Sequence, residues 1–179
     1  QYAYSTEVFL TQRFRTGGFL VSGGGQFTRQ VNLSLQYRKS KAIFFSAFPY
    51  QGTSSRATAS LLYQPWNQLE FNYSFTYSDF YRDSSGERIY EYPINRLKLT
   101  YQLSQYLFLR GITEINNFRK QLLTDFLASF TYIPGTVVYL GYGSLYQKLK
   151  WENNAYVDYV QFLETKRGFF FKMSYLWRM

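Results

Sequence analysis

The sequence predicts an all-β protein, an antiparallel transmembrane β-barrel of about ten strands in one domain over residues 1–179. The clearest observation is the stretch 69–78, LEFNYSFTYS, whose odd positions are Leu, Phe, Tyr, Phe and Tyr and whose even positions are polar. A period of two is typical of a strand that is wet on one face only. The length of the stretch also suits a tilted strand that crosses a bilayer.

Composition supports the same fold class. Aromatic residues make up 22% of the chain and alternate with polar residues instead of forming blocks. A transmembrane helix needs a run of roughly 18 or more apolar residues, and the sequence contains none. An alternating, half-polar chain of this kind is typical of barrel strands.

The same alternation predicts ten strands in order. They cover residues 7–15, 27–38, 42–48, 56–64, 69–78, 95–103, 107–116, 121–132, 137–146 and 168–178. Pro49 is expected to end the third strand because proline cannot donate to a sheet, and Pro134-Gly135 is a turn dipeptide. The glycines between residues 17 and 25 predict a flexible loop.

The connections alternate in length. Short turns are expected at 39–41, 65–68, 104–106 and 133–135, and mostly longer loops at 17–26, 49–55, 82–93, 117–120 and 147–166. In an antiparallel sheet this puts all the short turns at one end, which is the rule for bacterial outer-membrane barrels. The predicted location is therefore the cell outer membrane.

Aromatic residues recur at the ends of strands that run toward the short turns. We expect them to form a girdle at one membrane interface, where a ring has its apolar body in hydrocarbon and its polar tip among headgroups. The girdle comprises Tyr37, Tyr63, Tyr101, Tyr132 and Trp177. Tyr90, Tyr92, Tyr146, Trp151 and Tyr156 are candidates for the opposite rim.

The last predicted strand also resembles the C-terminal signal by which the outer-membrane assembly machinery recognises barrels. Lys166 is followed by Gly168 and then by alternating apolar residues to the chain end. The residues of this signal are Gly168, Phe171, Met173, Tyr175 and Trp177. An amphipathic closing strand without a recognition role is the alternative.

Three segments resemble a known family: RLKLTYQLSQYLFLRGITEINNF, LLTDFLASFTYIPGTVVYLGYG and RGFFFKMSYLWR. They are similar to the C-terminal barrel region of the DUF5916 family of outer-membrane proteins, over about residues 27–178. The resemblance implies the fold and the location, and no catalytic residues. Members usually carry an N-terminal carbohydrate-binding family 9-like domain and more strands, so this chain is expected to be a barrel or the C-terminal part of a larger one.

Charged residues lie on the polar sides of the predicted strands. If the apolar sides meet lipid, these charges line the lumen, and the turns place Arg96 opposite Glu114 and Arg110 near Asp125. With Lys98 they predict a ladder of charges over the sixth to eighth strands. Its function would be a charged constriction that selects solutes; the alternative is the ordinary filling of a narrow lumen by side chains.

The residue types present argue against an enzyme. The chain has no His and no Cys, which removes the usual general base, the thiolate metal sites and the His-dependent nucleophilic triads. No cofactor or metal is expected. The net charge of +9 is spread along the chain, and aromatic and basic residues lie on opposite strand faces, which disfavours nucleic-acid binding.

Two functions from different classes remain. The first is a non-catalytic outer-membrane barrel that acts as a membrane anchor, a pore or a subunit of an envelope complex. Its expected partners are outer-membrane lipids, lipopolysaccharide, the barrel assembly machinery and other envelope proteins or glycans, with Trp151 and Tyr156 as candidate contacts in the loop 147–166. The second is a soluble up-and-down barrel that binds a small apolar ligand inside.

Overall fold

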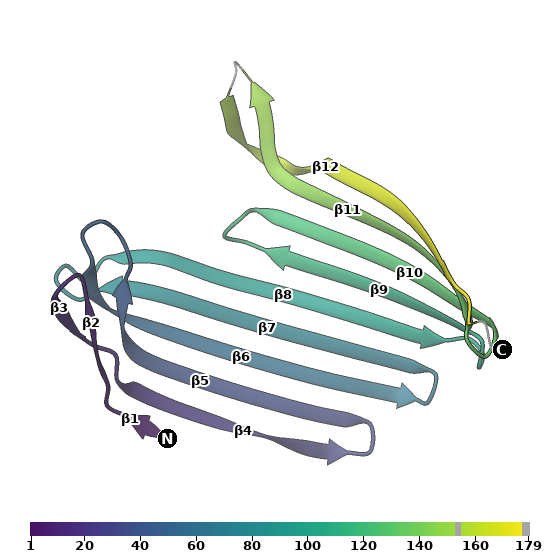
Figure 1. Ribbon diagram of the computed structural model, residues 1–179, viewed down its shortest axis with the longest axis horizontal. Helices are drawn as coiled ribbons and strands as arrows, with labels where there is room; N and C mark the ends of the chain where they lie inside the picture. Colours follow the sequence, from purple (N-terminus) through teal and green to yellow (C-terminus); the bar gives the residue numbers. More distant parts are fainter. Residues whose placement is uncertain (153–154, 177–179) are drawn as a thin grey trace.

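The computed structural model describes residues 1–152 and 155–176 (Figure 1), and these residues form twelve β-strands. The strands are β1 (Tyr2–Ala3), β2 (Thr6–Phe9), β3 (Gln12–Arg15), β4 (Gly18–Thr28), β5 (Val31–Phe44), β6 (Tyr50–Trp66), β7 (Leu69–Arg82), β8 (Arg88–Gln102), β9 (Leu107–Asn116), β10 (Gln121–Ile133), β11 (Thr136–Glu152) and β12 (Ala155–Ser174). No helix in the described ranges has the length and hydropathy to span a membrane.

Ten strands form one antiparallel sheet in the order β1-β4-β5-β6-β7-β8-β9-β10-β11-β12, and β2 and β3 form a separate hairpin. Figure 1 shows a single curved sheet without a second layer. The all-β antiparallel architecture is thus confirmed. Within the described ranges β12 does not pair with β4, so the sheet is open. Closure into a barrel stays a prediction.

The register gives the sheet two faces of opposite character. Leu61, Tyr73 and Leu97 lie side by side on β6, β7 and β8, and we call their side the apolar face. The neighbouring positions carry Ser60, Ser74 and Arg96, again side by side, and their side is the polar face. Directly opposed residues of antiparallel strands share a face, so each face is continuous from strand to strand.

The first strands differ from the prediction. Residues 7–15 form the β2–β3 hairpin, turned at Leu10 and Thr11 with φ of 46° and 65°. The glycine-rich segment 17–26, predicted as a loop, belongs largely to β4, because hydrogen bonding to β5 outweighs the low strand propensity of glycine. The predicted turn 39–41 lies inside β5. Of the predicted third strand 42–48, residues 42–44 are the end of β5 and residues 45–48 lie in the connection to β6.

Two predicted loops are also shorter than expected. The polar segment 82–93 turns only over residues 83–87, and β8 begins at Arg88. Segment 147–166 consists mostly of β11 and β12, whose hairpin bends away beyond β9 and β10 (Figure 1). Both segments carry mixed polar and aromatic residues, a pattern that favours a loop unless a partner strand pairs with it.

Successive connections lie alternately at the two ends of the sheet, as predicted. The turns 29–30, 67–68, 103–106 and 134–135 lie at one end of the sheet, on the right in Figure 1, and 45–49, 83–87 and 117–120 lie at the other. The connections at the second end have four or five residues, and those at the first have two, except for 103–106 with four. The predicted contrast in length is therefore present but much smaller than expected. We call the two ends the turn end and the loop end.

Gly135 offers a test of the turn end. The Pro134-Gly135 turn forms as predicted, with a φ of 92° at Gly135. An added Cβ would also lie 2.5 Å from the Leu176 Cβ. Gly135→Ala is therefore expected to lower the free energy of unfolding by about 1–3 kcal/mol. Gly25→Ala, where a Cβ meets nothing within 4 Å, is the control in urea unfolding. Equal effects of the two substitutions would contradict this account of the turn.

Candidate functional site

Three ion pairs cross the polar face between β7 and β10. Arg96 Nη1 lies 3.3 Å from Glu114 Oε2, and Arg110 Nη2 lies 3.9 Å from Asp125 Oδ1; these are the two pairs that the predicted turns placed together. Lys98 Nζ lies 3.1 Å from Glu70 Oε1, a pairing the sequence analysis did not predict. Together they leave this part of the face with balanced charge.

The ion pairs contribute little stability individually. Their side chains are partly exposed, and exposed pairs contribute about 0–1 kcal/mol each. The contact between Arg110 and Asp125 is the loosest, since Arg110 Nε and Asp125 Oδ1 are buried without a hydrogen-bond partner. The main effect of the pairs is therefore electrostatic neutrality, and their position along a lumen stays a prediction.

An aromatic cluster covers the polar face at the loop end. Phe44 stacks on Tyr50 with 5.0 Å between ring centroids, and Phe80 stacks on Tyr90 with 5.7 Å. Tyr92 continues the cluster, 5.4 Å from Tyr90. The prediction that Tyr90 and Tyr92 belong to an outer rim facing lipid is wrong, because their register partners Phe80 and Ser78 lie on the polar face.

Phe80 is the centre of this cluster, with only 2% of its surface exposed. It packs flat on the sheet because its cross-strand neighbourhood contains Gly52; a Cβ there would lie 2.2 Å from the ring. Arg82 extends its guanidinium carbon over the Tyr50 ring at 4.2 Å. The polar face thus changes from ion pairs in the middle of the sheet to a packed aromatic layer at the loop end.

The predicted girdle is only partly at one end. Tyr63 and Tyr101 lie on the apolar face close to the turn end, and Tyr132 lies at a register shift beside the 134–135 turn. Tyr37 is wrongly placed: it lies in the middle of β5, opposite Ala57, because the turn predicted at 39–41 does not exist. Trp177 lies outside the described residues.

Trp66 is an aromatic residue of the turn end that the sequence analysis missed. It pairs with Leu69 beside the 67–68 turn and is exposed. The sequence analysis placed residues 65–68 in a turn, and residues within a turn are not assigned to a face of the sheet. Trp66 therefore lies at the end of the sheet where Tyr37 was expected.

The predicted assembly signal lies on the edge strand β12. Gly168, Phe171 and Met173 pair with Gly143, Leu140 and Val138 of β11. Tyr175 follows the end of the strand and is exposed. Phe171 and Met173 are also exposed, on the apolar face. This exposed edge position is compatible with recognition by another protein, which stays a prediction.

The candidate partner loop around Trp151 and Tyr156 is a hairpin. The two backbones are directly opposed in β11 and β12, and their side chains lie outside the described part. Lys120 pairs with Asp158, which ties the 117–120 turn to this hairpin. The prediction of a long loop at 147–166 is therefore wrong.

A polar cluster on the apolar face was also missed. Tyr142 Oη lies 2.9 Å from Ser144 Oγ and donates to Glu164 at 3.2 Å. Ser144 also donates to Glu164. Glu164 was assigned to a loop, so nothing in the sequence pattern placed it beside β11. The cluster interrupts the apolar face at the point where β11 and β12 begin to leave the rest of the sheet.

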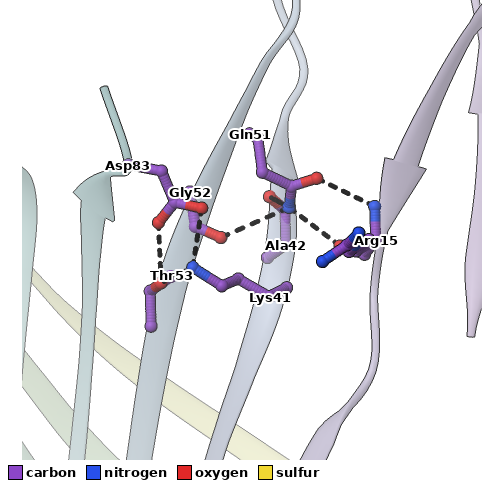
Figure 2. Close-up of polar contacts among 7 residues, drawn as sticks. All are labelled: Arg15, Lys41, Ala42, Gln51, Gly52, Thr53 and Asp83. Atoms are coloured by element: carbon purple, nitrogen blue, oxygen red, sulfur yellow. Dashed lines mark hydrogen bonds and ion pairs between the residues drawn. The ribbon is translucent and has the colours of Figure 1, made fainter. Parts of the chain in front are cut away.

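Polar contacts at the loop end join the N-terminal hairpin to the sheet (Figure 2). The Gln51 amide acts like a peptide group: its Oε1 accepts from Arg15 N at 2.8 Å and its Nε2 donates to Arg15 O at 2.8 Å. Nε2 also lies 3.0 Å from Ala42 O. One side chain therefore links β3, β5 and β6.

Asp83 anchors the 83–87 turn in the same region (Figure 2). It accepts from Lys41 at 2.7 Å and from Thr53 at 2.8 Å. Burial raises the pKa of the Asp83 carboxyl, but these hydrogen bonds and the Lys41 charge outweigh it and hold the pKa below its usual value. No group of three metal-binding side chains occurs in the part of the chain that the structure describes.

No protein-family model matches the sequence, and no curated protein matches it. The resemblance to the DUF5916 family stays a prediction.

The Asp83 contacts predict a pH dependence of stability. A lowered folded-state pKa contributes stability above the unfolded value of about 3.9, and this stability is lost as the pH falls through the folded value. Because the Asp83 and Lys41 side chains are 28% and 46% exposed, Asp83→Asn is expected to cost at most about 1 kcal/mol near pH 7. The difference from the wild type should shrink between about pH 5 and pH 3 in urea unfolding.

The control for this prediction is Glu7→Gln, which removes one exposed carboxylate of β2. It should leave both the stability and its pH dependence close to those of the wild type. A cost of Asp83→Asn that does not change between pH 7 and pH 3 would contradict the assignment.

Proposed function

We propose that this chain is an integral β-barrel protein of the outer membrane, or the C-terminal strands of a larger barrel, and that it serves as a membrane anchor, a pore or a subunit of an envelope complex. The apolar face meets the lipid and the polar face lines the interior. The observation that carries the proposal is the exposure of large apolar side chains on one face of a sheet whose other face holds ion pairs.

The apolar face is exposed over most of the sheet. Phe126, Leu140 and Phe171, on β10, β11 and β12, are 55%, 51% and 67% exposed. Their registers place them on the side that also carries Leu61 and Leu97. Soluble monomers rarely expose contiguous apolar patches of more than a few hundred Å². A hydrocarbon environment removes that cost, and the aromatic residues at the turn end suit its boundary.

A non-catalytic role agrees with the polar face. Glu70, Glu114 and Asp125 are each engaged by a cation, and the chain has no His and no Cys. Lipids, lipopolysaccharide and the assembly machinery are the proposed partners. They would contact the apolar face, the aromatic turn end and the edge strand β12.

A soluble apolar-ligand barrel is the second candidate, and one observation favours it. The apolar face has a groove of about 650 Å³ whose lining includes Leu99, Leu109, Gly111, Phe126 and Leu140. Gly111 opens this groove because it leaves no side chain between its neighbours on β8 and β10. In the membrane, the same groove would hold an acyl chain; in a soluble barrel, it would lie inside and bind the ligand.

Fractionation and heat-modifiability test the proposal. The chain is expressed with a signal peptide, the outer membrane is isolated, and boiled and unboiled samples are compared on a denaturing gel. The expected result is a mobility shift on boiling in the membrane fraction only, because a closed barrel resists the detergent until heated. A water-soluble protein that binds an apolar dye would favour the second candidate and contradict the proposal.

Two neighbouring substitutions sharpen this test. Leu61→Arg puts a charge on the apolar face, where it costs about 2–4 kcal/mol at the middle of a bilayer. Ser60→Arg adds the same charge to the polar face of the same strand, between Ser34 and Ser74. The first variant should lose the heat-modifiable form and the second should keep it. Membrane aggregates of the wild type without a shift would mean that further strands are needed for closure.

A further inference from the structure

The charges on the polar face are balanced from β7 to β10 but not on the neighbouring strands β5 and β6. From β7 to β10, each of the three acidic side chains on this face pairs with a cation. On β5 and β6, Arg38 and Arg56 lie directly opposite one another in the register and on the polar face. Like charges directly opposite across two strands destabilise a sheet. The position therefore has an energetic cost.

The surroundings supply no acid. On the polar face, the neighbour of Arg56 on β7 is Ser78, and the neighbour of Arg38 on β4 is Leu20. Asp79 lies next in the chain, but it is buried and accepts a hydrogen bond from Ser55 N at 2.8 Å. Among the described residues, neither arginine takes part in an ion pair, and both are exposed.

Neutral hydrogen-bonding groups border the two arginines. The adjacent register pair on the polar face is Gln36 and Thr58, whose Oε1 and Oγ1 lie 3.5 Å apart. The pair on the other side is Ser40 and Ser54. The two guanidinium groups are thus surrounded by an amide and several hydroxyl groups. All of these groups can donate hydrogen bonds, and among them only the guanidinium groups are charged.

The arginines also line open space. A hollow of about 550 Å³ lies between Gln36, Arg38 and Arg56 on one side and the N-terminal segment on the other, where Gln1, Tyr2 and Leu20 are among its lining residues. A second hollow, of about 800 Å³, shares Arg56 and is lined by Thr58, Ser78, Tyr90 and Tyr92 among others. Arg56 thus stands between this first hollow and the aromatic cluster at the loop end.

The geometry points to an anion-binding site formed by Arg38 and Arg56 on the polar face, for a small solute that carries an oxyanion group such as a carboxylate or a phosphate. Planar guanidinium groups bind such groups through paired hydrogen bonds. Gln36 and Thr58 add neutral donors, and the rings of Tyr90 and Tyr92 offer a stacking surface to the rest of the solute. The inference deepens the proposed function, and it rests on that function only in taking the polar face to be accessible to water.

An anion-binding role accounts for the placement of two arginines directly opposite one another. A bound oxyanion places negative charge between the two guanidinium groups and offsets their repulsion, so the pair is unfavourable when empty and favourable when occupied. In a pore, a positive position beside a neutral stretch of the same face favours anions over cations. The aromatic layer at the loop end would then restrict the size of the solute.

Calorimetric titration of the folded protein tests the site, in detergent or in water according to which form folds. The probes are inorganic phosphate and glucuronate at low ionic strength, and they distinguish a phosphate from a carboxylate as the preferred group. Arg38→Gln and Arg56→Gln are each expected to weaken binding of the preferred probe by at least about tenfold, the loss expected for a charged hydrogen bond. Arg29→Gln, which removes one charge in the 29–30 turn, is the matched control and should bind like the wild type.

A second readout separates binding from structure. Arg38→Gln should raise the urea midpoint of unfolding while it weakens binding, because it removes the like-charge contact. Ser78→Asp, which places a carboxylate opposite Arg56, should abolish probe binding without loss of folding. Folded wild-type protein that binds neither probe, or binding that both arginine variants retain, would overturn the site. A water-soluble protein that binds a probe would instead contradict the proposed function alone.

Discussion

Uninterrupted antiparallel pairing through the middle of the sheet is the constraint on which the other features depend. From β4 to β10 the register shifts lie toward strand ends, as between Tyr63 and Trp66 or between Phe80 and Tyr81. The pairing of β11 with β12 also shifts inside the strands, between Leu145 and Leu149. A shift of one residue in the middle of a strand would move its apolar side chains to the polar face. Because none occurs there from β4 to β10, these strands keep one apolar face and one face that carries the ion pairs. We propose that lipid covers the apolar face of this single layer.

The polar face is divided along and across the strands. In the middle of β7 to β10, ion pairs cancel charge; on β5 and β6, two arginines leave a positive position; and at the loop end, rings packed around Phe80 replace polar side chains. These parts follow from the register alone, since Arg96 faces Glu114 whereas Arg38 faces Arg56. The same geometry therefore gives either a neutral pair or an anion site, according to which residues it brings together.

The sequence predicted the middle of the sheet better than its beginning. Residues 107–116 coincide with β9, because alternation and tight turns determine both the strand and its register there. That is why the pair of Arg96 and Glu114 could be placed in advance. The pair of Arg38 and Arg56 could not, because an apparent turn at 39–41 separated residue 38 from the strand that continues to Phe44. β4 and the long β11–β12 hairpin form because they pair with a neighbouring strand, and local propensity alone did not predict them.

The central claim is that the apolar face meets lipid, and the absence of cysteine from the chain allows a direct measurement. Leu61→Cys and Ser60→Cys carry single spin labels on opposite faces of β6, and their collisions with oxygen and with a water-soluble nickel complex are measured in lipid vesicles. The account predicts that the label at 61 meets oxygen preferentially and the label at 60 meets nickel. Equal access of nickel to both labels, or the reverse preference, would contradict it.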